Sequence, residues 1–256
     1  MLLAIDIGNT DTVVGLFDGE KLATHFRIAS TRNLTSDEAG LTVSSLLAHH
    51  TGQTGLKIGR VAVCSVVPPL TGIYERMVRR YFDLEPLTIS SHVRLPFAVA
   101  YTDPSEVGAD RLANAAAGFA RYQKGMVVVD IGTATTFDII ADNGDYLGGV
   151  IAPGPHTAAA NLTQKAARLF EVRIEKPSGI IGKTTAEALK SGLYYGTIGM
   201  IDNILGVIFK DLGHPVPAVA TGGEAETFAS GSKYISEVLP TLTLEGIRII
   251  TNFNAR

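Results

Sequence analysis

The sequence predicts an α/β protein built from two copies of one domain, because a segment repeats, its turns are matched, and helical and strand-like segments alternate. One copy reads D-I-G-N-T-D-T-V-V-G-L-F-D-G at 6–19, and the other reads D-I-G-T-A-T-T-F-D-I-I-A-D-N-G at 130–144. The copies begin 124 positions apart, which is close to half of the 256 residues. We therefore expect a duplicated domain, with one copy at 1–118 and the other at 119–256.

Each copy is expected to open with three strands. An apolar run, at 2–5 and at 126–129, leads into Asp-Ile-Gly, a Thr-rich turn and a second strand-like run. That run ends at Asp18-Gly19 in one copy and at Asn143-Gly144 in the other. Both dipeptides suit the positive φ angles of tight hairpin turns, so a third strand should follow each of them.

The rest of the first half alternates helices and strands. Thr35 and Glu38 resemble a capping box, which predicts a helix that starts there and ends by Gly52. An apolar stripe containing Leu112 and Phe119 predicts a helix near the domain join. The other expected elements of this half are a strand at 60–67, a helix at about 70–82, short strands up to Tyr101 and this helix at about 110–122.

The second half continues the alternation after its three strands. A Pro-Gly-Pro sequence at 153–155 should precede a helix at about 157–169. A long helix is expected at about 185–211, followed by a strand at 217–220 that enters Thr-Gly-Gly at 221–223.

Composition and charge exclude several classes of protein. A chain that is 46% hydrophobic is too apolar to be disordered. The net charge of -3, without a lysine or arginine tract, argues against a nucleic-acid partner. The single cysteine, Cys64, excludes internal disulfides, and it is most simply a small buried hydrophobe of a cytoplasmic protein. Asp6 interrupts the N-terminal apolar run before a signal peptide could form, and no membrane partner is expected.

The two Asp-Ile-Gly turns are suited to Mg-phosphate. Asp6 and Asp130 each end an apolar strand and precede a glycine and hydroxyl residues. Backbone N–H groups and hydroxyls can hold phosphate oxygens there, while the carboxylate serves a hard cation directly or through water. Two such loops facing each other would hold a nucleotide in a cleft between the domains.

Competing motifs are absent or incomplete. The sequence contains no G-x-G-x-x-G, G-x-S-x-G or H-E-x-x-H motif. The segment G-I-I-G-K-T at 179–184 has two residues between its glycines where a P-loop has four. Arg76, Arg79 and Arg80 could form an anion patch, although a solvated helix face is the simpler interpretation.

One charged segment, E-V-G-A-D-R at 106–111, opens an Ala-rich helix. Asp110 could simply be the residue that caps this helix. Alternatively, Asp110 could accept a proton from a substrate hydroxyl while Arg111 orients an anionic group. The spacing alone leaves both interpretations open.

Four segments together resemble the type III pantothenate kinase family. They are D-I-G-N-T at 6–10, G-A-D-R at 108–111, D-I-G-T-A-T-T at 130–136 and Y-L-G-G-V-I-A-P-G at 146–154. The resemblance covers essentially the whole chain and implies duplicated ribonuclease-H-like (actin-like ATPase) domains with a nucleotide cleft between them. It also implies ATP-dependent phosphorylation of pantothenate to 4′-phosphopantothenate, the first step of coenzyme A biosynthesis.

The resemblance implies roles for individual residues. Asp110 would be the general base, Asp6 would lie near the magnesium of Mg-ATP, and Asp130 would hold a monovalent cation, potassium or ammonium. The implied ATP-binding residues are Asp6, Ile7, Gly8, Asn9, Thr10, Asp11, Thr12, Val13 and Thr133. The implied pantothenate-binding residues are Tyr101, Gly108, Ala109, Asp110, Arg111 and Thr185.

The resemblance further implies a homodimer, because Thr185 would serve the partner's site and the second domain would form the dimer. Two stretches depart from the family pattern: P-H-T-A-A-A at 155–160, and Thr184-Thr185, where Asn-Thr is more usual. Two alternatives remain from the sequence. One is another kinase or phosphatase of the same superfamily, acting on a different substrate. The other is an ATP-binding regulatory protein without turnover.

Overall fold

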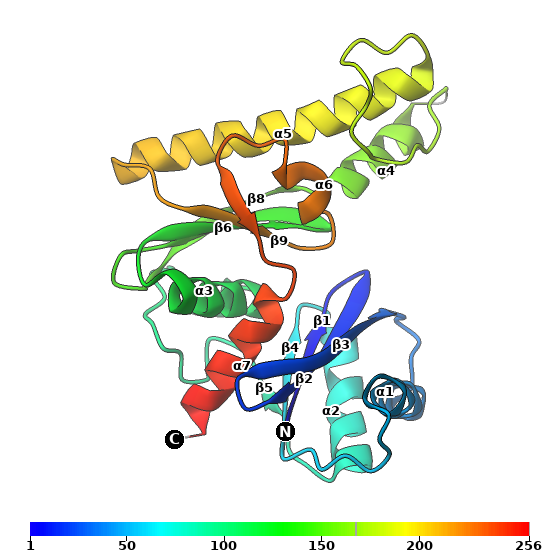
Figure 1. Cartoon of the computed structure of the whole chain (residues 1–256), viewed down its shortest axis with the longest axis vertical. Coiled ribbons are helices and arrows are strands. Elements are labelled where there is room, and N and C mark those ends of the chain that lie inside the picture. The colour runs from blue at the N-terminus through cyan, green and yellow to red at the C-terminus, as the bar shows by residue number, and fades with distance from the viewer. Residues whose placement is uncertain (167, 256) are drawn as a thin grey trace. The chain divides into compact units, whose positions relative to one another are not determined.

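The computed structural model describes residues 1–166 and 168–255. The chain forms two compact units, each built around a five-stranded sheet (Figure 1). Residues Met1–Arg121 and the segment from Leu242 onward make up the first unit. Residues Tyr122–Thr241 make up the second unit.

The first unit's sheet has the strand order β3-β2-β1-β4-β5. Its strands are β1 (Leu2–Ile7), β2 (Asp11–Asp18), β3 (Lys21–Ala29), β4 (Arg60–Ser65) and β5 (Leu87–Thr88). The central strand β1 pairs antiparallel with β2 and parallel with β4. The predicted hairpin is present, with Gly19 at a φ of 61° between β2 and β3.

Helices cover both faces of this sheet. Helices α1 (Ser36–Thr51) and α2 (Pro68–Phe82) pack on the face that carries Leu3 and Ile5. Helices α3 (Ala109–Tyr122) and α7 (Leu242–Asn254) pack on the opposite face, where Leu2 and Ala4 lie. Alternate side chains of β1 therefore supply two separate apolar layers, as the period of a strand requires.

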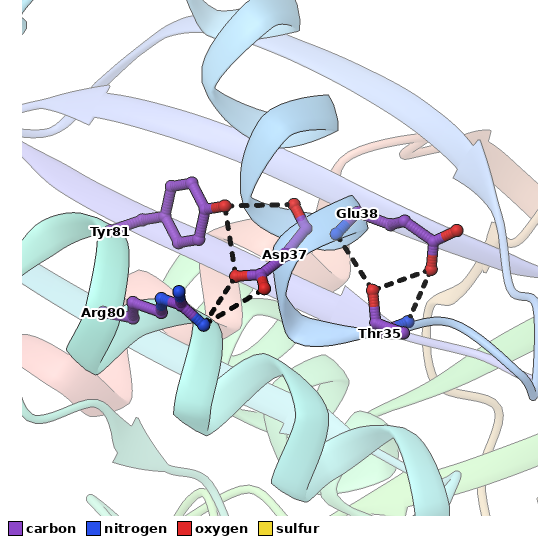
Figure 2. A network of polar contacts seen from close by, with 5 residues as sticks. All are labelled: Thr35, Asp37, Glu38, Arg80 and Tyr81. Atoms are coloured by element: carbon purple, nitrogen blue, oxygen red, sulfur yellow. Dashed lines mark hydrogen bonds and ion pairs between the residues drawn. The ribbon is translucent and has the colours of Figure 1, made fainter.

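The predicted capping box at the start of α1 is confirmed (Figure 2). The Glu38 amide donates to Thr35 Oγ1 at 3.2 Å, and the Thr35 amide donates to Glu38 Oε2 at 2.8 Å. Next to it, Asp37 pairs with Arg80 at 2.9 Å and accepts a hydrogen bond from the Tyr81 hydroxyl at 3.2 Å. Arg80 therefore ties α2 to α1 on a solvated face, which favours the simpler interpretation of this cationic residue.

The second unit repeats the topology of the first. Its strand order is β10-β9-β6-β7-β8, which is the first unit's order read from the other edge. Its strands are β6 (Met126–Ile131), β7 (Ala134–Ile140), β8 (Tyr146–Pro153), β9 (Ala218–Thr221) and β10 (Ile235–Val238). The second predicted hairpin is also present, with Gly144 at a φ of 93°. The duplicated α/β fold expected from the sequence is confirmed.

Three helices belong to the second unit: α4 (Pro155–Lys165), α5 (Thr185–Leu212) and α6 (Ala225–Ala229). Helix α5 lies across the sheet in Figure 1, and its Ile201 and Leu205 are fully buried in the same core as Val127 and Val129 of β6. Among the described residues, α5 is the one helix whose length and composition would allow it to cross a membrane. Its burial against β6 gives it a core role within this unit.

Two boundaries differ from the sequence prediction. The helix expected at about 157–169 runs from Pro155 to Lys165, because the Ala166 backbone turns extended there, and position 167 of that prediction lies outside the described residues. The segment assigned to the second domain at 119–256 includes α7, which instead packs on the first unit's sheet. The reason is that Leu244, Ile247 and Ile250 of α7 complete the apolar layer on one face of β1.

The close approach of α7 to α3 depends on Gly246. A Cβ atom at this position would overlap the Ala113 carbonyl group of α3. We therefore expect Gly246→Ala to lower the free energy of unfolding by about 1–3 kcal/mol, as other overpacked cores do. Urea unfolding of the purified variant measures this change.

The matched control for this substitution is Gly72→Ala in α2, where the nearest atom to a new Cβ is Arg76 Nη1 at 3.4 Å, the end of a flexible side chain. This control should keep or raise stability by up to about 1 kcal/mol, because alanine favours a helix over glycine. Equal stability of the two variants would contradict the packing argument.

Candidate active site

The first Asp-Ile-Gly turn follows β1 and is narrow. Asp6 is the next-to-last residue of β1 and pairs in register with Val13 of β2 and Cys64 of β4. The Gly8 amide donates to the Asp11 carbonyl at 2.9 Å, and a Cβ on Gly8 would lie 3.0 Å from the same oxygen. The glycine therefore allows the chain to turn tightly beside the Asp6 carboxylate.

Polar side chains of this turn are held in different ways. Asn9 and Thr10 are exposed. The Asp11 carboxylate pairs with Arg27 at 2.9 Å, and the fully buried Thr12 hydroxyl lies 2.9 Å from that of Ser30. The turn thus presents exposed polar residues next to two polar side chains whose partners lie on β3 and just after it.

Two predicted ATP-loop residues have side chains that serve the core. Ile7 is fully buried in the layer under α1 and α2, and Val13 packs against the layer under α3 and α7. The Ile7 side chain is therefore turned away from any nucleotide, and its backbone is what this residue can offer to a ligand.

Asp110 lies in the first turn of α3. Its Oδ1 accepts a hydrogen bond from the Arg111 amide at 2.8 Å, and a Cβ on Gly108 would meet the same oxygen. Gly108 thus makes room for this carboxylate conformation. A carboxylate at a helix N-terminus is favoured by the helix dipole. Because α3 already begins at Ala109, Asp110 is not the residue that caps this helix, and its side chain accepts from the next amide rather than from one two or three positions further on.

Asp6, Cys64 and Asp110 form an electrostatic cluster within the first unit. Burial raises the pKa of the Asp110 carboxyl, and the Arg111 amide and guanidinium offset part of that effect. Burial also raises the pKa of the Cys64 thiol well above its usual range, and the Asp6 and Asp110 carboxylates raise it further. Cys64 is fully buried, as expected, and its thiol also hydrogen-bonds Asp6. The contact between Cys64 and Asp6 follows from the pairing register of β1 and β4, so it has no local signal in the sequence.

The raised pKa of Asp110 predicts a stability effect of defined sign. Above its unfolded-state pKa of 3.8, the folded protein binds more protons at Asp110 than the unfolded chain does. The contribution of Asp110 to the free energy of unfolding therefore falls as the pH rises through the window between 3.8 and the raised value. Asp110→Asn removes this titration, so its stability relative to wild type should increase across that window.

Urea unfolding of both proteins at a series of pH values from 4 to 8 tests this pH dependence. A stability difference that does not change with pH, or that changes in favour of wild type as the pH rises, would contradict the burial of an ionisable Asp110 carboxyl.

The second Asp-Ile-Gly turn follows β6 and is one residue shorter. Asp130 pairs with Thr136 across β6 and β7, and Asp6 pairs with Val13 across β1 and β2. The chain between the paired residues is therefore one residue shorter in the second turn. The Gly132 amide donates to the Ala134 carbonyl at 2.9 Å and closes this turn. We call residues 130–133 the Asp130 loop; its last residue, Thr133, is exposed.

Two glycines allow other segments to contact the Asp130 loop. Gly222, at a φ of 94°, follows β9, and a Cβ there would overlap Asp130 Oδ1 and the Ile131 carbonyl. Gly154 precedes α4, and a Cβ there would overlap the Gly132 carbonyl. The sequence predicts turns at both glycines. Their close approach to the loop depends on packing between segments distant in the chain.

The donor set at the Asp130 loop suits a hard cation. The Asp130 carboxylate and the Ile131 carbonyl oxygen lie at the same glycine, and carboxylate and carbonyl oxygens are the ligands that such ions prefer. Among the described residues, no group of three or more His, Cys, Asp or Glu side chains could hold a metal by itself. A metal bound to a nucleotide needs only one or two protein carboxylates, so Asp6 also fits its expected role beside Mg-ATP.

The residues expected to bind pantothenate fall in both units. Tyr101 is half-buried in a loop of the first unit, which also contains the 108–111 segment, and Arg111 is buried. Thr185 begins α5 in the second unit and is exposed. Thr184, the N-cap of α5, accepts a hydrogen bond from the Glu187 amide at 3.2 Å, so it performs the structural task of an N-cap.

The two like-ordered sheets form a duplicated ribonuclease-H-like fold. A ROK hexokinase from Thermus thermophilus is similar in fold, with a TM-score of 0.52 at 13% identity, over 99% of this chain and 98% of that one. A structure described as a Baf-family transcriptional activator from Campylobacter jejuni has a TM-score of 0.62 at 20% identity, over 99% and 98%. Both likenesses show the fold alone.

The family is shown by sequence. The model of the type III pantothenate kinase family matches residues 2–206. A type III pantothenate kinase from Myxococcus xanthus is 45% identical over 254 residues, which are 99% of each chain. The chain belongs to the type III pantothenate kinase family, and it is an enzyme of the phosphotransferase class.

Proposed function

We propose that the protein transfers the γ-phosphoryl group of ATP to the primary hydroxyl of pantothenate, giving 4′-phosphopantothenate and ADP in the first step of coenzyme A biosynthesis. The observation that carries this proposal is the Asp110 carboxylate, held by the Arg111 amide at the start of α3 within the region that the family model matches. Its raised pKa makes it a better proton acceptor than an ordinary aspartate.

In the reaction, the pantothenate hydroxyl oxygen bonds to the γ-phosphorus. The bond from that phosphorus to the bridging oxygen breaks, and its electron pair leaves with ADP. Because the transition state is loose, the protein contributes mainly by positioning and charge neutralisation. Asp110 orients the hydroxyl and takes its proton late in the step. Tyr101 and the 108–111 segment, including Arg111, hold pantothenate.

The nucleotide is assigned to the two Asp-Ile-Gly turns. Backbone amides and polar side chains of residues 6–13, together with Thr133, would bind ATP. Asp6 would hold the magnesium of Mg-ATP, directly or through water, and this ion neutralises phosphate charge when bound. The narrow turn at Gly8 and the exposed Asn9 and Thr10 support this assignment.

A monovalent cation, potassium or ammonium, is assigned to Asp130. The support is chemical: the Asp130 carboxylate and the Ile131 carbonyl oxygen lie together against Gly222, and oxygen donors of this kind suit a hard ion. When bound, the ion supplies positive charge near the nucleotide phosphates. Asp130 holds it, and the Gly222 turn leaves space for it.

A homodimer formed through the second unit is part of the proposal, with Thr185 of each protomer serving its partner's pantothenate site. Large apolar side chains that lie exposed mark an interface where they gather in one contiguous patch. In the described part of the second unit they are Leu147, Val150, Ile151, Leu162, Phe170, Ile180, Ile181, Tyr195 and Val207. In the first unit they are Met1 and Leu41. Sedimentation equilibrium should give twice the chain mass, and a monomer would contradict this assignment.

The alternatives are weaker. A regulatory protein that binds ATP without turnover would need neither a general base nor an acceptor site, yet Asp6 and Asp110 occur together in one cluster of the first unit. The Campylobacter jejuni structure described as an activator is 20% identical and shares the fold. A cytoplasmic location, in which pantothenate and ATP are available, goes with the proposed reaction.

A panel of acceptors tests the substrate assignment. Purified protein with Mg-ATP and potassium is given pantothenate, a hexose, acetate or polyphosphate, and each product is identified by mass spectrometry. We expect pantothenate to gain one phosphoryl group and the other acceptors to remain unchanged. Phosphorylation of another acceptor in preference to pantothenate would keep the kinase class and overturn the substrate.

A further inference from the structure

A hydrogen-bonded pair of side chains in the second unit is not used by the proposed chemistry. His156, in the first turn of α4, has its Nε2 atom 3.0 Å from Oε1 of Glu224, which follows the Gly222 turn. The two residues are 68 positions apart. The His156 side chain is 61% exposed, while that of Glu224 is 24% exposed. His156 belongs to the 155–160 stretch that departs from the family pattern.

Both partners are attached to the Asp130 loop through their neighbours. On the α4 side, Thr157 Oγ1 donates to the Thr133 carbonyl at 2.6 Å, and the Gly154 amide donates to the same oxygen at 3.2 Å. On the other side, the Glu224 amide donates to the Ile131 carbonyl at 3.0 Å. The His156–Glu224 hydrogen bond therefore closes a ring of contacts that includes two carbonyl groups of the loop.

The segments that form this ring of contacts pack closely against the loop. Gly154 and Gly222 approach the loop so closely that a Cβ atom at either position would overlap loop atoms. If the start of α4 or the turn at Gly222 moved, the loop would have to move with it.

We infer that the His156–Glu224 pair is a positioning clasp that joins α4 to the Gly222 turn around the Asp130 loop and so strengthens ATP binding. Neither residue is assigned to the reacting atoms. The hydrogen bond between the two side chains fixes the two segments that hold the loop. This inference rests on the proposed function only in assigning ATP to the Asp130 loop.

The clasp predicts a change in nucleotide affinity rather than in the rate of the chemical step. His156→Ala should raise the Kd for Mg-ATP and the KM for ATP by about threefold to tenfold, in the range of couplings measured between contacting residues. The kcat and the KM for pantothenate should stay within about twofold, because Asp110 is untouched. Calorimetric titration with Mg-ATP and steady-state kinetics measure these quantities.

Three further variants separate positioning from general destabilisation. The loss of ATP affinity in the double variant His156→Ala/Glu224→Ala should be smaller than the sum of the losses in His156→Ala and Glu224→Ala, because the same interaction is lost in all three variants. His156→Gln keeps an N–H donor for Glu224 and should restore most of the affinity. The control is His214→Ala, an exposed histidine of the same unit that lies against the Pro215 carbonyl, and it should match wild type.

The clasp is overturned if His156→Ala binds ATP as tightly as His214→Ala, if the single effects add fully, or if kcat falls with an unchanged KM for ATP. The calorimetric readout needs no acceptor. If wild-type protein binds ATP but does not phosphorylate pantothenate, the substrate assignment is overturned. The calorimetric affinities of the variants then decide on the clasp by themselves. Wild-type protein that binds no ATP would overturn both.

Discussion

Asp110→Asn is expected to lower kcat by about 10²- to 10⁴-fold, which is the usual contribution of a positioned general base. The Asn side chain can still accept the Arg111 amide that Asp110 Oδ1 accepts at 2.8 Å, so the start of α3 should keep its geometry. It cannot take a proton from the pantothenate hydroxyl. The Kd for Mg-ATP should stay near that of wild type, because the assigned nucleotide loops are unchanged.

Single-turnover kinetics with saturating ATP and pantothenate measure this loss at the chemical step. The matched control is Asp18→Asn, an exposed carboxylate of the same unit at the end of β2, whose turnover should equal that of wild type. Near-normal turnover of Asp110→Asn would remove Asp110 from the role of base and leave it as a helix-start residue.

Asp130→Ala is expected to abolish activation by potassium and to weaken the use of ATP. The substitution removes a carboxylate that lies against Gly222 together with the Ile131 carbonyl oxygen. Without it, the proposed ion loses the charged ligand assigned to it. The effect should appear mainly in the KM for ATP, since Asp110 and the pantothenate residues lie in other segments.

Initial rates measured over a range of potassium concentrations, with sodium keeping the ionic strength constant, test this prediction. Wild type should show saturable activation by potassium, and the variant should show none. Asp211→Ala, which removes an exposed carboxylate near the end of α5, serves as the control and should keep the wild-type response. A variant at Asp130 that still responds to potassium would place the cation elsewhere.

The duplicated fold could be predicted because local chemistry marks it. Gly19 and Gly144 are needed for the positive φ of two hairpin turns, and the sequence alone places them at matching points of the repeat. Thr35 and Glu38 form a capping box because both partners lie within one helical turn. Signals of this kind depend on neighbours in sequence, so they can be read without a structure.

The position of α7 could not be predicted in the same way. Its apolar residues, such as Ile247 and Ile250, would suit either sheet, and the choice depends on contacts with residues more than 100 positions away. Gly246 fits closely against Ala113 only once both helices are in place. Its role has no local sequence signal.

The candidate site shows the same division. Asp6 and Asp130 were identified because each ends an apolar strand before a glycine, which is a local pattern. The contact of Cys64 with Asp6 follows from the register of β1 on β4, and that register is set by the whole sheet. His156 and Glu224 meet only because two segments fold around one loop.

The most direct test of the central claim is ADP release by purified protein with Mg-ATP, measured with and without pantothenate and in potassium or sodium. The account predicts turnover that requires pantothenate and is activated by potassium. ADP release without pantothenate, or only with another acceptor, would contradict the substrate assignment. Binding of ATP with no turnover under any of these conditions would contradict the proposed function and favour a regulatory protein.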